Sequence, residues 1–233
     1  FAPQLQWNAA LFHTVNSDDL LFISNGLAAG YFTNFGRTQR QGLELGLAQQ
    51  YSSFGWSASY SYLRATYESS ACIVAEGNST AETSAACTGD DEIEVRPGNR
   101  IPGLPQHSFK FGADWQPAAG WSVGTQLRAY SGQFVRGNEN NAHQADGVDF
   151  NGSGRVGGFA VVDMTASWKP TANLELFGKV SNLFDRRYGS AGILGENAFD
   201  AAGAIQAPAD WRAEQFVGPG APRAAWLGVR LQF

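Results

Sequence analysis

AAWLGVRLQF, residues 224–233, is the stretch of sequence that decides the fold. Every second side chain from Ala225 to Phe233 is apolar, whereas Arg230 and Gln232 fall on the opposite face. Successive side chains of a β-strand alternate between the two faces of a sheet, so this stretch predicts a strand with one apolar and one mixed face. Such a strand suits a wall with hydrocarbon on one side and a polar interior on the other.

The same alternation recurs throughout the chain. Strands are expected at residues 4–24, 31–50, 56–62, 109–115, 121–128, 159–168 and 174–184. With the last stretch they make a set of about eight. The composition agrees, because a chain with 13% aromatic residues is too rich in rings to be disordered and one with 28 glycines is too rich in glycine to be helical. We therefore expect a single all-β domain.

Charge and hydropathy exclude several classes of protein. The formal net charge is -5 and the 16 Lys and Arg residues are scattered, so no nucleic-acid partner is expected. No run of about 18 apolar residues occurs, which excludes a membrane-spanning helix but not a barrel. The three histidines are far apart, and neither a Gly-x-Ser-x-Gly elbow nor a metal-ligand spacing exists. No enzyme activity, cofactor or metal is therefore expected.

The connections between the predicted strands alternate between short and long. The short ones are at residues 51–55, 117–120 and 170–173, and the long ones at 69–105, 136–157 and 189–222. Outer-membrane barrels have short periplasmic turns and long extracellular loops. The pattern thus predicts extracellular long loops and a periplasmic C-terminus. It leaves residues 25–30 as an unusually short outer loop.

Aromatic residues provide a separate indication of a membrane. Six lie on the expected lipid face near an expected periplasmic end: Trp7, Trp56, Trp115, Trp121, Trp168 and Phe233. Aromatic rings gather at membrane interfaces because the ring is apolar while its polar edge can reach water and headgroups. The alternative is a soluble sandwich whose tryptophans fill a core, and both the aromatic girdle and the unequal connections disfavour it.

Several motifs resemble one known family. The segment VSNLFDRRY at residues 180–188 resembles the penultimate-strand signature of TonB-dependent receptors, and residues 227–233 resemble their closing strand with its C-terminal Phe. The segments NFGRTQRQGLEL at 34–45 and GNRIPGLP at 98–105 are similar to earlier strands of the same barrel. The resemblance implies that residues 1–233 are the C-terminal region of a 22-stranded transmembrane antiparallel β-barrel. About eight strands would form its last third, and the plug domain and first strands would lie outside this chain.

The resemblance also implies a function and partners. It implies a bacterial outer-membrane receptor for TonB-energised uptake of a scarce nutrient such as a ferric siderophore. The implied partners are outer-membrane lipid, the plug domain, the extracellular ligand and the TonB complex, the last through the missing N-terminal region. The closing strand with Leu231 and Phe233 would also contact the barrel-assembly machinery. A simple girdle role for Phe233 is an equally good interpretation.

One long loop carries the candidate ligand-binding residues. They combine a cation, a carboxylate, amides and an imidazole: Arg136, Asn138, Glu139, Asn140, Asn141 and His143. Loops on a rigid scaffold commonly carry binding function, so this segment is the candidate site. An ordinary solvated loop would have a similar composition.

Cys72 and Cys87 are the two cysteines of the chain, and both fall in one expected extracellular loop. An even pair in an oxidising compartment predicts a disulfide, which would contribute about 3 kcal/mol in the chain-entropy model. The alternative is two free thiols.

Two other functions compete with uptake. A small closed outer-membrane barrel with a structural or adhesin role would require residues 4–24 to pair with 223–233. A barrel enzyme is the other alternative. The chain also begins at Phe1 without an initiator Met or a signal peptide, so we expect it to be a piece of a longer exported protein.

Overall fold

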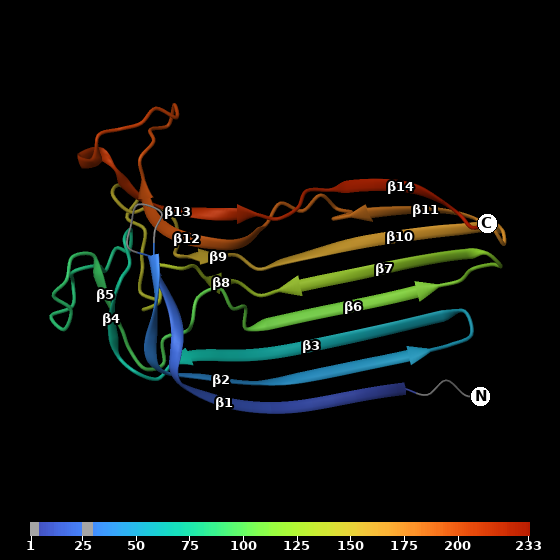
Figure 1. Ribbon diagram of the computed structural model, residues 1–233, viewed down its shortest axis with the longest axis horizontal. Coiled ribbons are helices and arrows are strands. Elements are labelled where there is room, and N and C mark those ends of the chain that lie inside the picture. Colours follow the sequence, from blue (N-terminus) through green and yellow to red (C-terminus); the bar gives the residue numbers. More distant parts are fainter. Residues whose placement is uncertain (1–4, 25–29) are drawn as a thin grey trace.

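The computed structural model describes residues 5–24 and 30–233, and within them eight strands form one antiparallel sheet (Figure 1). In sheet order they are β1 (Leu5–Ser24), β2 (Gly30–Gln50), β3 (Phe54–Tyr67), β6 (His107–Trp115), β7 (Trp121–Tyr130), β10 (Phe159–Thr171), β11 (Leu174–Ser181) and β14 (Ala224–Leu231). Each strand pairs with the preceding sheet strand of the sequence, so the topology is up-and-down. The predicted all-β fold with about eight strands is confirmed.

The register places like side chains in rows. Ala166, Gly178 and Leu227 are directly paired across β10, β11 and β14, so they share one face. On the opposite face, Arg128 of β7 forms an ion pair of 2.7 Å with Asp163 of β10. The alternation of the sequence has therefore become one apolar and one charged surface of the sheet.

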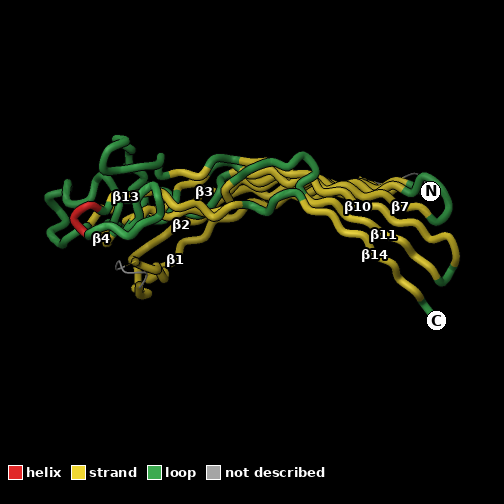
Figure 2. Tube along the Cα trace, turned by 90° about the horizontal axis from the view of Figure 1, so that it is seen from above, coloured by secondary structure: helices red, strands yellow, loops and turns green. Residues whose placement is uncertain are grey.

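The sheet is open and curved. β1 and β14 are its two edges in the part of the chain that the structure describes, and Figure 2 shows the arc between them. A small closed barrel would need these two strands to pair, and they lie at opposite ends of the sheet order. The eight strands are thus an arc of wall, and the structure gives no support to the small closed barrel.

The short turns and the C-terminus lie at one end of the sheet and the long loops at the other (Figure 1). Gly120 closes one turn with a φ of +76°, and a Cβ on it would lie 2.6 Å from the carbonyl oxygen of Lys169. Glycine permits both the positive φ and the close approach to this carbonyl oxygen, because it has no side chain. The short outer loop predicted at residues 25–30 falls outside the described residues, which resume at Gly30.

The long loops and the residues just before the second of them contain short strands that the sequence did not reveal. They pair as β4 (Ala71–Val74) with β5 (Glu92–Val95), β8 (Gln133–Phe134) with β9 (Arg155–Val156), and β12 (Gly189–Asn197) with β13 (Arg212–Pro219). One 3-10 turn, Pro208–Asp210, precedes β13. We call the three long loops, residues 69–105, 136–157 and 189–222, the loop head. No helix among the described residues is long and apolar enough to cross a membrane.

The buried apolar side chains gather within the loop head and where it meets the sheet, and the faces of the sheet away from it are largely exposed. One cluster consists of Phe35, Tyr67, Ile73, Ala75, Ile93 and Val95, where β2 and β3 meet β4 and β5. The five tryptophans of the predicted girdle instead lie near the short turns, where Trp7 is 73% and Trp115 51% exposed and Trp56 is half-buried. Trp121 stacks on Trp168 with ring centroids 5.5 Å apart. This distribution is that of a girdle and not of a sandwich core.

Candidate functional site

The loop head is held together by backbone pairing between loops that are distant in sequence. Arg136 forms a parallel bridge with Ile193 of β12, and Phe150 forms one with Ala213 of β13. The peptide N–H of Asn151 donates to the carbonyl oxygen of Ala213 at 2.8 Å. The loop that carries the predicted ligand-binding residues is thereby attached to the last long loop.

Asparagine side chains attach the same segment to the first long loop. The Asn78 side chain is fully buried, and its Nδ2 donates to the carbonyl oxygen of Gly137 at 2.6 Å. From the other side, Asn140 Nδ2 donates to Thr80 Oγ1 at 2.7 Å. Buried polar groups need partners, so these amide hydrogen bonds add to the small apolar clusters of the loop head, one of which consists of Val135, Val156 and Leu194.

Asn138 and Asn141 complete this network. Asn138 is 1% exposed and donates from Nδ2 to the carbonyl oxygen of Gly154 at 3.0 Å. Asn141 exchanges two hydrogen bonds with the backbone of Arg100, one from its Nδ2 and one to its Oδ1. Asn141 does so at a φ of 60°, a conformation that asparagine tolerates better than most residues. All three long loops therefore behave as one body.

His143 is buried and both of its ring nitrogens are occupied. Nδ1 accepts the peptide N–H of Ser79 at 3.1 Å, and Nε2 lies 3.2 Å from the carbonyl oxygen of Gly152. Because a carbonyl oxygen can only accept, Nε2 carries the proton and Nδ1 does not. Burial lowers the pKa of His143, which keeps the ring neutral. No ring lone pair remains for a metal or a ligand.

Glu139 is the buried acid of the segment, at 7% exposure. Burial raises its pKa to about 7, while the Gly137 N–H, which its Oε1 accepts at 3.1 Å, and the charge of Arg136 act to lower it. Burial raises the pKa of Tyr67, and the nearby charge of Glu139 raises it further; Tyr67 is 1% exposed, and its hydroxyl has no hydrogen-bond partner. The acid is thus placed where its charge is costly near neutral pH.

The cysteines form the predicted disulfide. Cys72 and Cys87 are bonded with their Cα atoms 5.5 Å apart, and Cys72 belongs to β4. With Glu92 they make the one group of three potential metal ligands within 4.8 Å among the described residues. Since both sulfurs are bonded to each other, this group is not a metal site.

The sequence of the chain matches one family of known proteins. The family model for the TonB-dependent receptor-like β-barrel matches residues 1–183. The chain belongs to the TonB-dependent receptors. It is 27% identical over 114 residues to the ferrienterobactin receptor of Escherichia coli (strain K12), a stretch of 46% of this chain and 15% of that protein.

Solved receptors show the same fold. The siderophore receptor PiuA from Acinetobacter baumannii superposes with a TM-score of 0.66 at 18% identity, over 97% of this chain and 26% of that one. For the ferric yersiniabactin uptake receptor FyuA from Yersinia pestis the TM-score is 0.63 at 18% identity, over 98% and 28%. The chain therefore spans about a quarter of the length of these TonB-dependent receptors, which are transport receptors and not enzymes.

The six predicted ligand-binding residues of this TonB-dependent receptor have different environments. Arg136 is exposed, and Asn140 and Asn141 are partly exposed. The other three, Asn138, Glu139 and His143, are buried and bonded to the protein's own backbone. Asn78 and Asn99 are not among the predicted residues but also brace the loops, Asn99 by donating from Nδ2 to the carbonyl oxygen of Asn140 at 3.0 Å. Both stand beside glycine in long loops, as loop-bracing asparagines often do.

Asn182, in the motif VSNLFDRRY, was read only as part of a strand. The prediction of a strand over 174–184 is wrong at its end, because β11 stops at Ser181 and Asn182 has a φ of 48°. Its peptide N–H donates to Asp163 Oδ1 at 2.8 Å, and its Nδ2 donates to the carbonyl oxygen of Ala221 at 3.0 Å. Asn182 therefore joins β10 and β11 to the segment before β14.

We expect Glu139→Gln to stabilise the loop head at pH 8 by roughly 2 to 3 kcal/mol and to have little effect at pH 4. The folded-state pKa of Glu139 lies above its ordinary value, so its contribution to stability is present below pH 4.5 and is lost as the pH rises through about 7. His143 acts oppositely. The pKa of His143 is lowered, so its contribution to stability is present above pH 6.5 and is lost as the pH falls.

Hydrogen exchange of segment 136–143, corrected for intrinsic rates, measures both effects. Protection in the unmodified receptor should be greatest at mildly acidic pH, and Glu139→Gln should extend it to pH 8. An identical pH profile in the variant would contradict the assignment.

Proposed function

We propose that this chain is the C-terminal part of a bacterial outer-membrane receptor for TonB-energised uptake of a scarce nutrient, specifically a ferric siderophore. The observation that carries the proposal is the open arc of eight antiparallel strands with all long loops at one end. This arc superposes on part of a siderophore receptor over 97% of the present chain. The names of the similar receptors, for ferrienterobactin and ferric yersiniabactin, support the choice of cargo.

The loop head would be the outer, ligand-facing surface. In this orientation the short turns and β14 face the periplasm, as short turns do in outer-membrane barrels. The exposed side chain of Arg136 and the accessible parts of Asn140 and Asn141 would contact the ligand. The buried Asn138, Glu139 and His143 would act by fixing the loop shape.

The inner face of the arc would contact the plug domain. It presents charged groups such as the ion pair of Arg128 with Asp163, and Lys179 next to the Trp226 ring at 5.8 Å. TonB would act through the N-terminal region that this chain does not contain. The barrel-assembly machinery would contact the last strand, where Leu231 and Phe233 are exposed.

The formal charge of the loop head indicates which class of ferric complex it would bind. Its three loops carry thirteen carboxylates and five guanidinium groups, whereas the remainder of the chain carries eight carboxylates against eleven Lys and Arg. The net formal charge of the loops is -8, of which the buried Glu139 contributes one unit only when ionised, and such an excess of carboxylates attracts cationic ligands and repels polyanions. Among ferric siderophores we therefore favour neutral or cationic complexes for this chain, so its cargo would differ in charge from that of the ferrienterobactin receptor.

The test is uptake of radiolabelled iron by a bacterium whose only siderophore receptor is the complete protein containing this chain. We expect energised uptake of a neutral or cationic complex, abolished by a protonophore. Arg136→Ala should lower binding about tenfold, since a hydrogen bond to a charged group contributes about 1.5 kcal/mol or more.

Lys169→Ala is the matched control, because Lys169 is an exposed cation at the short-turn end of the sheet. It should leave uptake unchanged at equal surface levels of the receptor. If neither neutral nor cationic iron complexes are taken up, the proposed cargo class is refuted.

A further inference from the structure

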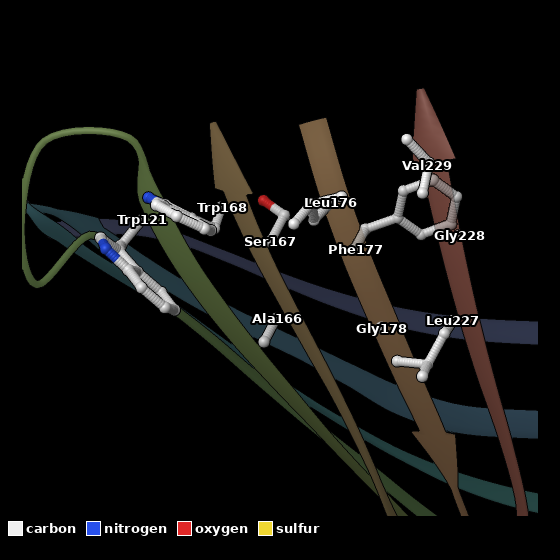
Figure 3. Close-up of a pocket in the computed structure, with 10 residues that line it drawn as sticks. All are labelled: Trp121, Ala166, Ser167, Trp168, Leu176, Phe177, Gly178, Leu227, Gly228 and Val229. Atoms are coloured by element: carbon white, nitrogen blue, oxygen red, sulfur yellow. The ribbon is translucent and has the colours of Figure 1, made fainter. Parts of the chain in front are cut away.

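The outer face of the sheet carries an apolar groove that spans three strands. Its floor consists of Ala166 on β10 and Gly178 on β11, which are directly paired. Trp168 and Leu176 form the wall on the side of the short turns, and Leu227 of β14 forms the flank (Figure 3). The groove has a volume of about 530 Å³, which is within the range of ligand-binding clefts.

The groove exists because small residues stand among large ones. Gly178 has no side chain, and a Cβ placed on it would lie 3.1 Å from Leu227 Cδ2. One methyl group of Leu227 therefore lies next to the glycine, although the residue as a whole is 93% exposed. Val229, paired with Leu176, extends the wall and is 63% exposed.

The position of the groove indicates what occupies it. Trp121 and Trp168 are stacked at its end, and the nitrogen-bearing edges of both rings point away from Ala166 (Figure 3). Indoles take this place at a membrane interface, with the ring toward hydrocarbon and the N–H toward headgroups. The floor begins two residues from Trp168, which is about 7 Å along a strand, just inside the hydrocarbon region.

We propose that this groove binds one acyl chain of a phospholipid in the leaflet next to the short turns. The lining is apolar apart from the Ser167 hydroxyl and the two indole N–H groups at its end, which suits a hydrocarbon chain and not a polar ligand. The two exposed indole N–H groups lie where the phospholipid headgroup would be. The inference concerns the outer wall of the receptor and goes beyond uptake, because it holds for any cargo.

The test uses the complete receptor, reconstituted in phosphatidylethanolamine and phosphatidylglycerol and then released in mild detergent. Native mass spectrometry counts the phospholipids that remain bound. Ala166→Leu fills the floor from β10, and Gly178→Leu fills it from β11, where the nearest atom is the movable end of the Leu227 side chain. Each variant should lower retention of one phospholipid about tenfold, by the usual effect of added methylenes in an apolar pocket.

Ala113→Leu is the matched control. Ala113 lies on β6, two residues from Trp115 just as Ala166 lies two residues from Trp168, and it does not line the groove. It should retain the phospholipid. Equal retention in all four proteins, loss in only one of the two filled variants, or retention of lipopolysaccharide instead would overturn the proposal. Uptake is measured separately, so failure of this proposal is distinct from failure of the transport function.

Discussion

Residues 1–233, exported alone with a signal peptide, will not support energised uptake of any ligand, whereas the complete receptor will. The physical reason is the open sheet. β1 and β14 are edge strands, and an edge in lipid leaves backbone N–H and C=O groups without partners. Each such group costs several kcal/mol in hydrocarbon, so the arc is unstable there by itself.

Closure of the arc into a small barrel would not restore the function. Pairing β1 with β14 would bring Arg128, Asp163 and Lys179 into a narrow lumen, since all three lie on the inner face. Uptake of radiolabelled iron by cells with the fragment, compared with cells with the complete receptor at equal outer-membrane levels, measures the difference. Protonophore-sensitive uptake by the fragment would show that the remainder of the receptor is dispensable.

Leu227→Arg will destabilise the folded receptor in a bilayer by roughly 1 to 2 kcal/mol, because it places a cation on the lipid face between the interface, where the cost is small, and the middle of the bilayer, where it is largest. Leu227 is 93% exposed in a row with Ala166 and Gly178, so its surroundings in the membrane are hydrocarbon. Denaturant unfolding in lipid vesicles gives the free-energy difference.

Thr165→Arg is the matched control for this substitution. Thr165 precedes Ala166 on β10, so it lies at nearly the same depth on the opposite, polar face. We expect it to cost less than Leu227→Arg, because its surroundings are polar, even though Lys179 is its direct partner on β11. Equal destabilisation by both substitutions would mean that the apolar face does not contact lipid.

The strands were predictable because a strand in a wall between lipid and a polar interior has a local signature. The long strand expected at 31–50 is observed at Gly30–Gln50, and the one expected from 4 to 24 is described from Leu5 to Ser24. The end of β11 was not predictable. Asn182 leaves the strand because Asp163 and Ala221 offer it hydrogen bonds, and neither is near it in sequence.

The candidate site was predictable only as a segment. Its composition marked Arg136 to His143 as polar and loop-like, but burial divides these residues into an exposed and a structural group. Burial depends on Asn78 and Ser79, which are more than 50 residues earlier in the chain. No local pattern encodes such a contact.

The sequence by itself determined which residues face hydrocarbon, where the turns lie, and that Cys72 can reach Cys87, because alternation and short separation are local properties of a chain. The tertiary structure alone decided that His143 has no free ring nitrogen and that Glu139 is buried. It also decided that Ala166 and Gly178 meet to form a groove floor. These three results depend on pairing between distant strands and loops, where free energy is gained only when the whole set assembles.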